Sequence, residues 1–120
     1  MSYFLKIIAL ENCGYSKKAL DLLINHNIEH QSIIINYDEK EKFKTDYINT
    51  YPQIYLMKKN SNGNLLLGGY NELNNFINIF KDYKNKNKDI FYKEKNNFIN
   101  NNTNWSNKAT LRLIQLISSK

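Results

Sequence analysis

The sequence contains one cysteine, Cys13, and it lies where two local patterns meet. Before it, Tyr3–Leu10 is a mostly apolar run without Gly or Pro, which is typical of a buried central strand. After it, Ala19, Leu22 and Leu23 recur at helical spacing. A cysteine at a helix start faces unpaired backbone N–H groups and the positive end of the helix dipole, which favour the thiolate over the thiol. The pattern therefore predicts a nucleophilic sulfur, and a buried, inert cysteine is the alternative.

Other segments supply the elements that would position this cysteine. Residues 31–36 are β-branched and apolar at their centre, which predicts a strand buried on both faces. Gln53–Lys58 and residues 65–67 flank the turn-rich residues 60–63, which predicts an antiparallel hairpin. The first helix is expected to end near residues 25–27, where asparagines suit a left-handed cap. Two strands joined by that helix imply a right-handed parallel crossover.

Two more helices are expected within the first 83 residues. Residues 38–49 predict a short charged helix with Phe43, Tyr47 and Ile48 on its inward side. A later helix is expected with Asn71 as its cap. Its apolar side chains fall on one face: Leu73, Phe76, Ile77 and Phe80. The predicted order is βαβαββα, an α/β arrangement.

Three segments resemble glutaredoxins, and they occur in the family's order. Residues 13–23, beginning Cys-Gly-Tyr-Ser, look like the active-site helix. Residues 50–55, with Pro52, resemble the Thr-Val-Pro segment that contains a cis-proline. Residues 67–73, with Gly68 and Gly69, resemble the segment that holds glutathione. The resemblance covers residues 3 to 83 and implies a thioredoxin fold, with a mixed four-stranded sheet flanked by helices.

The resemblance also implies a redox-active centre and a role for each matching residue. Cys13 would be the catalytic nucleophile, which takes the glutathionyl group from a mixed disulfide. Ser16 stands in the place of the second cysteine of dithiol members, so only the monothiol cycle remains; Ser16 and Lys17 would support the thiolate. Leu10 stands where many members carry Lys or Arg, and Lys17, Lys44 or another cation would compensate. The residues expected to bind glutathione are Tyr15, Tyr51, Pro52, Gly69, Tyr70 and Asn71.

Plainer interpretations stay open for several of these residues. Ser16 also suits a helix first turn, and Pro52 suits the entry to a strand. The two glycines at 68 and 69 also suit a tight turn. His26 and His30 have no metal-ligand spacing and are interpreted as surface or cap residues.

The motif Cys13-Gly14-Tyr15-Ser16 also resembles the Cys-Gly-Phe-Ser of monothiol glutaredoxins that carry iron–sulfur clusters. This implies an alternative function, in which Cys13 and glutathione bind a [2Fe-2S] cluster between two protomers of a carrier or sensor. Those proteins usually have a loop before the cysteine and a Trp-Pro pair. Residues 10–13 leave no room for the loop, and no proline follows Trp105. A monomer is therefore expected, or a dimer if a cluster is bound, and no other metal is expected.

Length and composition indicate a soluble globular protein of 120 residues with a mean hydropathy of −0.62. No run approaches about 18 apolar residues and no signal-peptide pattern opens the chain, so a membrane partner is not expected. A lone cysteine favours a reducing compartment, and a cytoplasmic location is predicted. The implied activity is glutathione-dependent electron transport between thiols and disulfides. Its partners would be glutathione and glutathionylated proteins or small disulfides.

The positive charge is concentrated at the end of the chain. Residues 1–83 carry nine lysines and nine acids, whereas residues 84–120 carry eight cations and two acids. This division predicts a thioredoxin-fold domain at 1–83 and a basic Asn/Lys-rich extension at 84–120, with a loop at residues 100–104 and a terminal helix. The apolar stripe of that helix is expected at Leu111, Ile114 and Ile117.

Two functions are open for the basic extension. Its terminal helix could pack on the parent domain or on a second subunit. Alternatively, the basic tail could bind nucleic acid, with its cations contacting phosphates and its aromatic rings stacking on bases. These rings are Phe91, Tyr92, Phe98 and Trp105.

Overall fold

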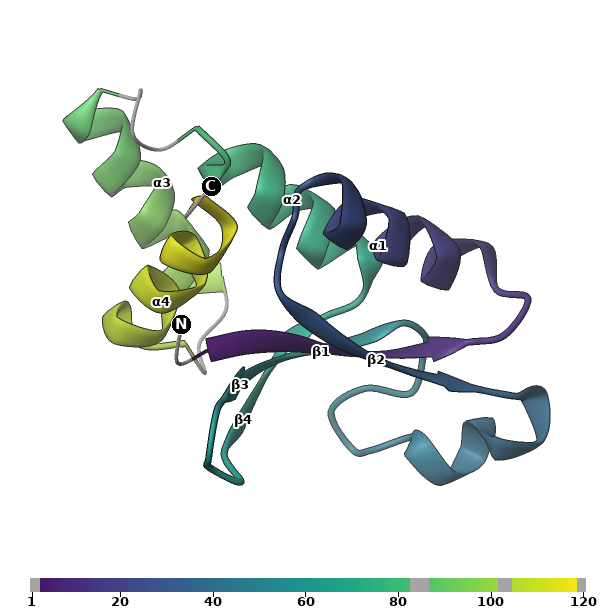
Figure 1. Ribbon diagram of the computed structural model, residues 1–120. Helices are drawn as coiled ribbons and strands as arrows, with labels where there is room; N and C mark the ends of the chain where they lie inside the picture. Colours follow the sequence, from purple (N-terminus) through teal and green to yellow (C-terminus); the bar gives the residue numbers. More distant parts are fainter. Residues whose placement is uncertain (1–2, 83–86, 102–104, 119–120) are drawn as a thin grey trace.

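One four-stranded sheet organises the molecule (Figure 1), in a computed structural model that describes residues 3–82, 87–101 and 105–118. Its strands are β1 (Tyr3–Leu10), β2 (His30–Ile35), β3 (Gln53–Lys58) and β4 (Asn64–Gly68), in the order β2-β1-β3-β4. β1 runs parallel to β2 and antiparallel to β3, and β4 runs antiparallel to β3. The predicted central position of the first strand is therefore confirmed.

Helices cover one face of this sheet. They are α1 (Gly14–Asn25), α2 (Tyr70–Phe80) and α4 (Asn107–Ser118), while α3 (Lys88–Asn101) packs against α4. A 3₁₀ helix, η1 (Tyr37–Phe43), lies between β2 and β3 in the chain. In Figure 1, α1, α2 and α4 lie above the sheet and η1 lies below it. The βαβ unit, the hairpin and the closing helix make a thioredoxin fold with two further helices at its end, so the predicted fold class is confirmed.

Alternation along β1 explains how the helical layer is held. Leu5, Ile7 and Ala9 are buried on the face that α1 and α2 cover. Ala19 and Leu23 of α1 pack into this layer, and both side chains are fully buried. Because successive side chains of a strand point to opposite faces, Lys6 and Ile8 are on the other side of the sheet.

The C-terminal helices extend the same hydrophobic core. Phe98 of α3 packs with its ring centroid 4.9 Å from that of Phe76 in α2 and 5.7 Å from that of Trp105. The Trp105 Nε1–H donates a hydrogen bond of 3.0 Å to the carbonyl oxygen of Leu66 in β4. The buried apolar residues of α4 belong to the same core cluster: Leu113, Ile114, Leu116 and Ile117. The C-terminal segment therefore packs on the parent domain, which is one of the alternatives that the sequence left open.

The expected features of the C-terminal segment differ from the structure in several ways. Leu111 is 41% exposed, so it does not belong to the buried stripe, while Leu113, outside the expected stripe, is fully buried. α3 was not expected, and it includes Asn100 and Asn101 of the predicted loop. Residues 102–104 of that loop lie outside the described residues. The division of the chain into domains at 1–83 and 84–120 stays a prediction.

The predicted helix at residues 38–49 is wrong in length and partly in orientation. It begins after Asn36, whose side chain and that of Glu39 form a reciprocal cap, but it ends at Phe43. The hydroxyl of Thr45 accepts hydrogen bonds from the backbone N–H groups of Tyr47 and Ile48, and this local turn competes with a helix. As a result Tyr47 is 83% exposed rather than directed inward.

Two further expectations concern the βαβ unit. α1 ends at Asn25, and Asn27 takes the left-handed conformation with φ 53°, so the predicted cap is confirmed. The expectation that the second strand is buried on both faces is wrong, because β2 is at an edge of the sheet and Ile34 is 63% exposed. The order of strands determines this exposure, and it is not contained in the local pattern.

Candidate functional site

A tight turn between β1 and α1 positions Cys13. The Glu11 N–H donates to the Ile35 carbonyl at 2.8 Å, and the Cys13 N–H donates to the Leu10 carbonyl at 3.2 Å. Asn12 between them has φ 62°, in the left-handed region that asparagine tolerates. The turn makes Cys13 the N-cap residue of α1, as the sequence predicted.

Cys13 is half-buried and lines two surface grooves. One, of about 450 Å³, is bounded by the end of β1, the start of α1 and Ile34. The other, of about 540 Å³, reaches Asn36, Tyr37 and Asp38. The Cys13 side chain makes no capping hydrogen bond to α1, so the helix start is not occupied by its own N-cap side chain. The sulfur is thus at a helix N-terminus and within reach of ligands from either groove.

The charges around the sulfur are mixed. Lys17 lines the first groove together with Cys13. Glu11 lines both grooves and Asp38 lines the second. Lys18 is directed elsewhere, since its Nζ lies over the rings of Tyr15 and Tyr70. Of the two lysines in the first turn, only Lys17 is therefore part of the groove at Cys13.

Ser16 has a structural role that sequence reasoning missed. Its side chain is 1% exposed, and its Oγ accepts a 3.0 Å hydrogen bond from the Leu10 N–H. The hydroxyl thereby fastens the last residue of β1 to the first turn of α1. Ser16 stabilises the turn that presents Cys13, whether or not it also contacts the sulfur.

Two tyrosines join the starts of α1 and α2. The rings of Tyr15 and Tyr70 lie 6.0 Å apart between centroids. Lys18 Nζ is 5.6 Å from the first centroid and 5.9 Å from the second, a cation–π arrangement. Tyr15 stays 58% exposed, so this cluster is accessible beside the turn that carries Cys13.

The proline and glycine segments also meet. The Tyr51–Pro52 peptide bond is cis, as the resemblance implied. A Cβ added to Gly69 would lie 3.4 Å from the Pro52 carbonyl oxygen, so the two backbones are in close contact. Gly69 is the N-cap of α2, and its N–H donates to Glu72 Oε1 at 2.7 Å. Asn71, predicted as the cap, lies in the first turn instead.

Replacing Gly68 with alanine is expected to destabilise this segment by about 1–3 kcal/mol. Gly68 has φ 135°, and an added Cβ would lie 2.6 Å from Glu72 Cγ and Oε1. Glu72 would have to move away and release the Gly69 N–H. Gly14→Ala is the matched control, because nothing lies within 4 Å of a Cβ there. Urea unfolding of both variants checks this; equal loss of stability would contradict the strain argument.

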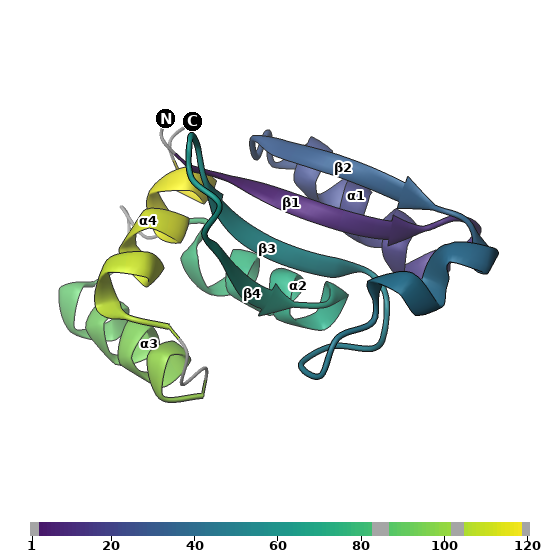
Figure 2. The same cartoon turned by 90° about the horizontal axis from the view of Figure 1, so that it is seen from below.

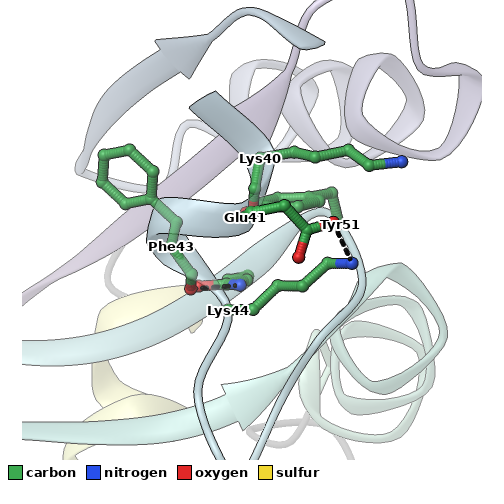
Figure 3. A network of polar contacts seen from close by, with 6 residues as sticks. Lys40, Glu41, Phe43, Lys44 and Tyr51 are labelled. Atoms are coloured by element: carbon green, nitrogen blue, oxygen red, sulfur yellow. Dashed lines mark hydrogen bonds and ion pairs between the residues drawn. The ribbon is translucent and has the colours of Figure 1, made fainter. Parts of the chain in front are cut away.

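Tyr51 is tied to η1 rather than free to face a ligand (Figure 3). Its hydroxyl donates to the Lys40 carbonyl, and Gln53 Nε2 donates to the Phe43 carbonyl at 2.9 Å. Burial is the main reason that the pKa of Tyr51 is raised above its usual value. Lys44, considered as a compensating cation, forms an ion pair of 2.9 Å with Glu41. The network fastens η1 to the segment that contains the cis-proline.

Tyr51→Phe is expected to lower the free energy of unfolding near neutral pH. The free energy of unfolding of this variant should also fall less than that of the wild type when the pH is raised to alkaline values. Because the pKa of Tyr51 is raised in the folded state, its contribution is present below about pH 10 and is lost as pH rises through the folded pKa. Loss of the hydrogen bond should cost about 0.5–1.5 kcal/mol near neutral pH. Urea unfolding at about pH 8 and about pH 11 measures both effects. Tyr47→Phe, at an exposed tyrosine, should change neither, and a Tyr51→Phe variant with the wild-type pH dependence would contradict the assignment.

The structure thus connects some of the predicted residues and separates others. Tyr15, Tyr70, Gly69 and Pro52 form a chain of contacts on one side of the α1 start. The grooves at Cys13 are lined instead by the ends of β1 and β2 and by α1. His30 Nδ1 lies 2.7 Å from the Ile28 carbonyl oxygen, consistent with a local structural role.

The site has a single cysteine and no metal-binding cluster among the residues that the structure describes. Among the described residues, no group of three or more His, Cys, Asp or Glu side chains could hold a metal ion. No helix in the described ranges is long and apolar enough to span a bilayer. The fold and the site together define a thioredoxin-fold protein with a single cysteine at the start of its first helix.

Comparison with known proteins adds the following. No family model matches the chain, and a search of curated proteins finds no match. Among solved structures, the crystal structure of glutaredoxin 1 from Francisella tularensis complexed with cacodylate is similar, with 26% sequence identity and a TM-score of 0.46. The match covers 63% of this chain and 93% of that chain.

Proposed function

We propose that this protein is a glutathione-dependent thiol–disulfide oxidoreductase that works by a monothiol mechanism. The observation that carries the proposal is the position of Cys13, half-buried at the N-cap of a 12-residue helix and lining two grooves. Partly exposed cysteines at helix N-termini are a common setting for reactive cysteines in proteins. The proposed setting is a reducing compartment such as the cytoplasm, where glutathione is available.

The proposed cycle has two exchange steps. In the first, the Cys13 thiolate attacks the glutathione sulfur of a mixed disulfide; a Cys13–glutathione disulfide forms, and the substrate thiolate leaves and takes up a proton. In the second, the thiolate of another glutathione attacks the sulfur of the bound glutathione. Oxidised glutathione leaves and the Cys13 thiolate is restored. Since the chain has one cysteine, no internal disulfide can interrupt this cycle.

Glutathione is proposed to bind along the contacts between the two helix starts. The backbone before Pro52 would pair with the extended glutathione backbone, as an added strand. The N–H groups of Tyr70 and Asn71, in the first turn of α2, would receive a carboxylate. Tyr15 would flank the sulfur, and Lys17 would lie on the groove side. The hydroxyl of Tyr51 is already used by η1, so its backbone rather than its side-chain oxygen is the proposed contact.

A single-turnover experiment tests the proposal. The protein is mixed with a glutathionylated peptide in the absence of free glutathione, and its intact mass is measured. One glutathionyl group should appear on the wild type and should disappear when glutathione is added. Failure of the wild type to acquire the group, or its retention in excess glutathione, would contradict the mechanism.

The alternative function, a shared [2Fe-2S] cluster, uses the same sulfur. Each chain offers one cysteine, so a cluster would require two chains and glutathione. The feature that motivates it is the segment Cys13-Gly14-Tyr15-Ser16, which resembles the Cys-Gly-Phe-Ser of cluster-carrying monothiol glutaredoxins. Anaerobic reconstitution with iron, sulfide and glutathione separates the two functions: a brown, glutathione-dependent dimer supports the cluster, and a colourless monomer counts against it.

A further inference from the structure

The face of the sheet opposite α1 and α2 carries a large groove. Figure 2 views this face, and η1 and the following loop lie at one end of it. The groove has a volume of about 690 Å³ and is lined by β1, β3, β4 and the segment 42–47. We call it the sheet groove. It exists because η1 is short and the chain after Phe43 is not helical, so within the described residues no helix crosses the middle of the sheet on this side.

A second groove adjoins the first around the edge strand. It has a volume of about 340 Å³ and lies between the β3–β4 hairpin and the first turns of α4. We call it the hairpin groove. Asn64 and Leu65, at the start of β4, line both grooves. Neither groove includes a residue that lines the grooves at Cys13.

The charged side chains that line the two grooves are all positive. No Asp or Glu is among their lining residues, although residues 1–83 as a whole carry nine lysines and nine acids. Near the sheet groove, Glu41 is neutralised by its ion pair with Lys44, and Asp46 is exposed in the adjoining loop. The cations that line the grooves are Lys6, Lys42, Lys58, Lys108 and Arg112.

Aromatic side chains accompany these cations. Phe43, Tyr47 and Tyr55 line the sheet groove, and Tyr3 lines the hairpin groove with the Arg112 guanidinium 5.8 Å from its ring centroid. Tyr47 is 83% exposed and therefore free to stack on a planar group. By contrast, the rings of Phe98 and Trp105 are 6% and 4% exposed, so they are not available for stacking.

We propose that the sheet groove and the hairpin groove together bind single-stranded nucleic acid. A cationic channel follows the phosphates, and exposed rings stack on bases that a duplex would keep paired. Single strands fit better than duplex because the rings need unstacked bases. The proposed site combines the sheet with the start of α4, so it differs from binding through a detached basic tail. It is independent of the chemistry at Cys13.

Fluorescence anisotropy with a labelled single strand of about 16 nucleotides tests this proposal on the full chain. If all five cations contact phosphates, log K should fall with log salt with a slope of about −3.5, or about 100-fold between about 50 mM and about 200 mM salt. Absence of binding at the lower salt concentration would overturn the proposal. Tighter binding of a duplex of equal length would overturn it as well.

Two triple variants with equal loss of charge locate the site. Replacing Lys42, Lys58 and Lys108 by glutamine should weaken binding about tenfold or more and reduce the salt slope by about 2. The control replaces Lys81, Lys88 and Lys93, which are exposed and line neither groove. Equal effects of the two triples would mean unspecific attraction and overturn the proposal. Far-UV circular dichroism confirms that both variants fold.

The stacking part has its own test. Tyr47→Ala should weaken single-strand binding about fivefold and leave heparin binding unchanged, because heparin carries charge without bases. Equal weakening for both ligands, or no change for the single strand, would overturn the assignment of a nucleic-acid site. Retained transfer of glutathione to Cys13 in the same variant would show that the two sites are separate, and its loss would overturn their independence.

Discussion

Replacing Cys13 with serine is expected to abolish the proposed reduction of glutathione mixed disulfides, with a loss of at least about 1,000-fold. A serine hydroxyl is not ionised near neutral pH and cannot form the disulfide intermediate. No second thiol can replace it, because the chain has one cysteine. Initial rates with a glutathionylated peptide, glutathione and a coupled reductase measure the effect.

Stability provides the control for this variant. Serine is a favourable N-cap residue, because its hydroxyl can accept a hydrogen bond from a backbone N–H in the first turn of the helix. The Cys13 side chain makes no such hydrogen bond to α1. Cys13→Ser should therefore be as stable as the wild type, or more stable by up to about 1 kcal/mol. If the variant were unfolded, its loss of activity would be explained by unfolding and not by the missing sulfur. An active Cys13→Ser variant would refute the proposed mechanism.

The local parts of this fold are visible in the sequence because short-range patterns determine them. The apolar run of β1, the helix start at Cys13 and the asparagines that end α1 are each set by residues within a few positions. The cis peptide bond at Pro52 was implied by the resemblance and not by any pattern. These elements are sufficient to place the cysteine at a helix start.

The parts that sequence reasoning missed depend on contacts between distant segments. Ile34 is exposed because β2 is an edge strand, and strand order is a property of the whole sheet. The helix that begins after Asn36 ends at Phe43, and beyond it the hydroxyl of Thr45 accepts hydrogen bonds from the N–H groups of Tyr47 and Ile48. Threonine is a residue that can form such a turn, but the charge and spacing of residues 38–49 favoured a longer helix. α3 has few apolar residues, and Phe98 is its only buried one. Its position is understood from the packing of Phe98 against Phe76 and Trp105.

The candidate site shows the same division. The sequence indicates Cys13 and its helix, but not that Ser16 accepts the Leu10 N–H or that Lys18 lies over two rings. It also does not indicate that the hydroxyl of Tyr51 is bound by η1. Each of these contacts requires a side-chain direction, which follows from the turns and crossovers that bring the segments together. The sequence therefore identifies residues that belong to the candidate site, but not the atoms that each of them contacts.

Leu113→Ala is expected to lower the free energy of unfolding by about 2–5 kcal/mol, because Leu113 is fully buried in the core cluster. This is a large part of the about 5–15 kcal/mol that stabilises a typical domain. Leu111→Ala is the matched control, since Leu111 is on the same helix but 41% exposed, and its effect should stay within about 0.5 kcal/mol. Similar losses for both variants would contradict the assignment of the buried face of α4.

The same experiment decides whether α4 folds together with the sheet. Trp105 is the only tryptophan, and its indole N–H is bound to the Leu66 carbonyl, so its fluorescence reports on docking of the C-terminal segment. Urea unfolding followed by this fluorescence and by far-UV circular dichroism should give one shared midpoint in the wild type, lowered equally for both probes by Leu113→Ala. A fluorescence transition that precedes the loss of secondary structure would mean that residues 84–120 undock as a separate unit. Coincident transitions would mean that the predicted boundary at residue 83 divides the sequence by composition but not the folded core.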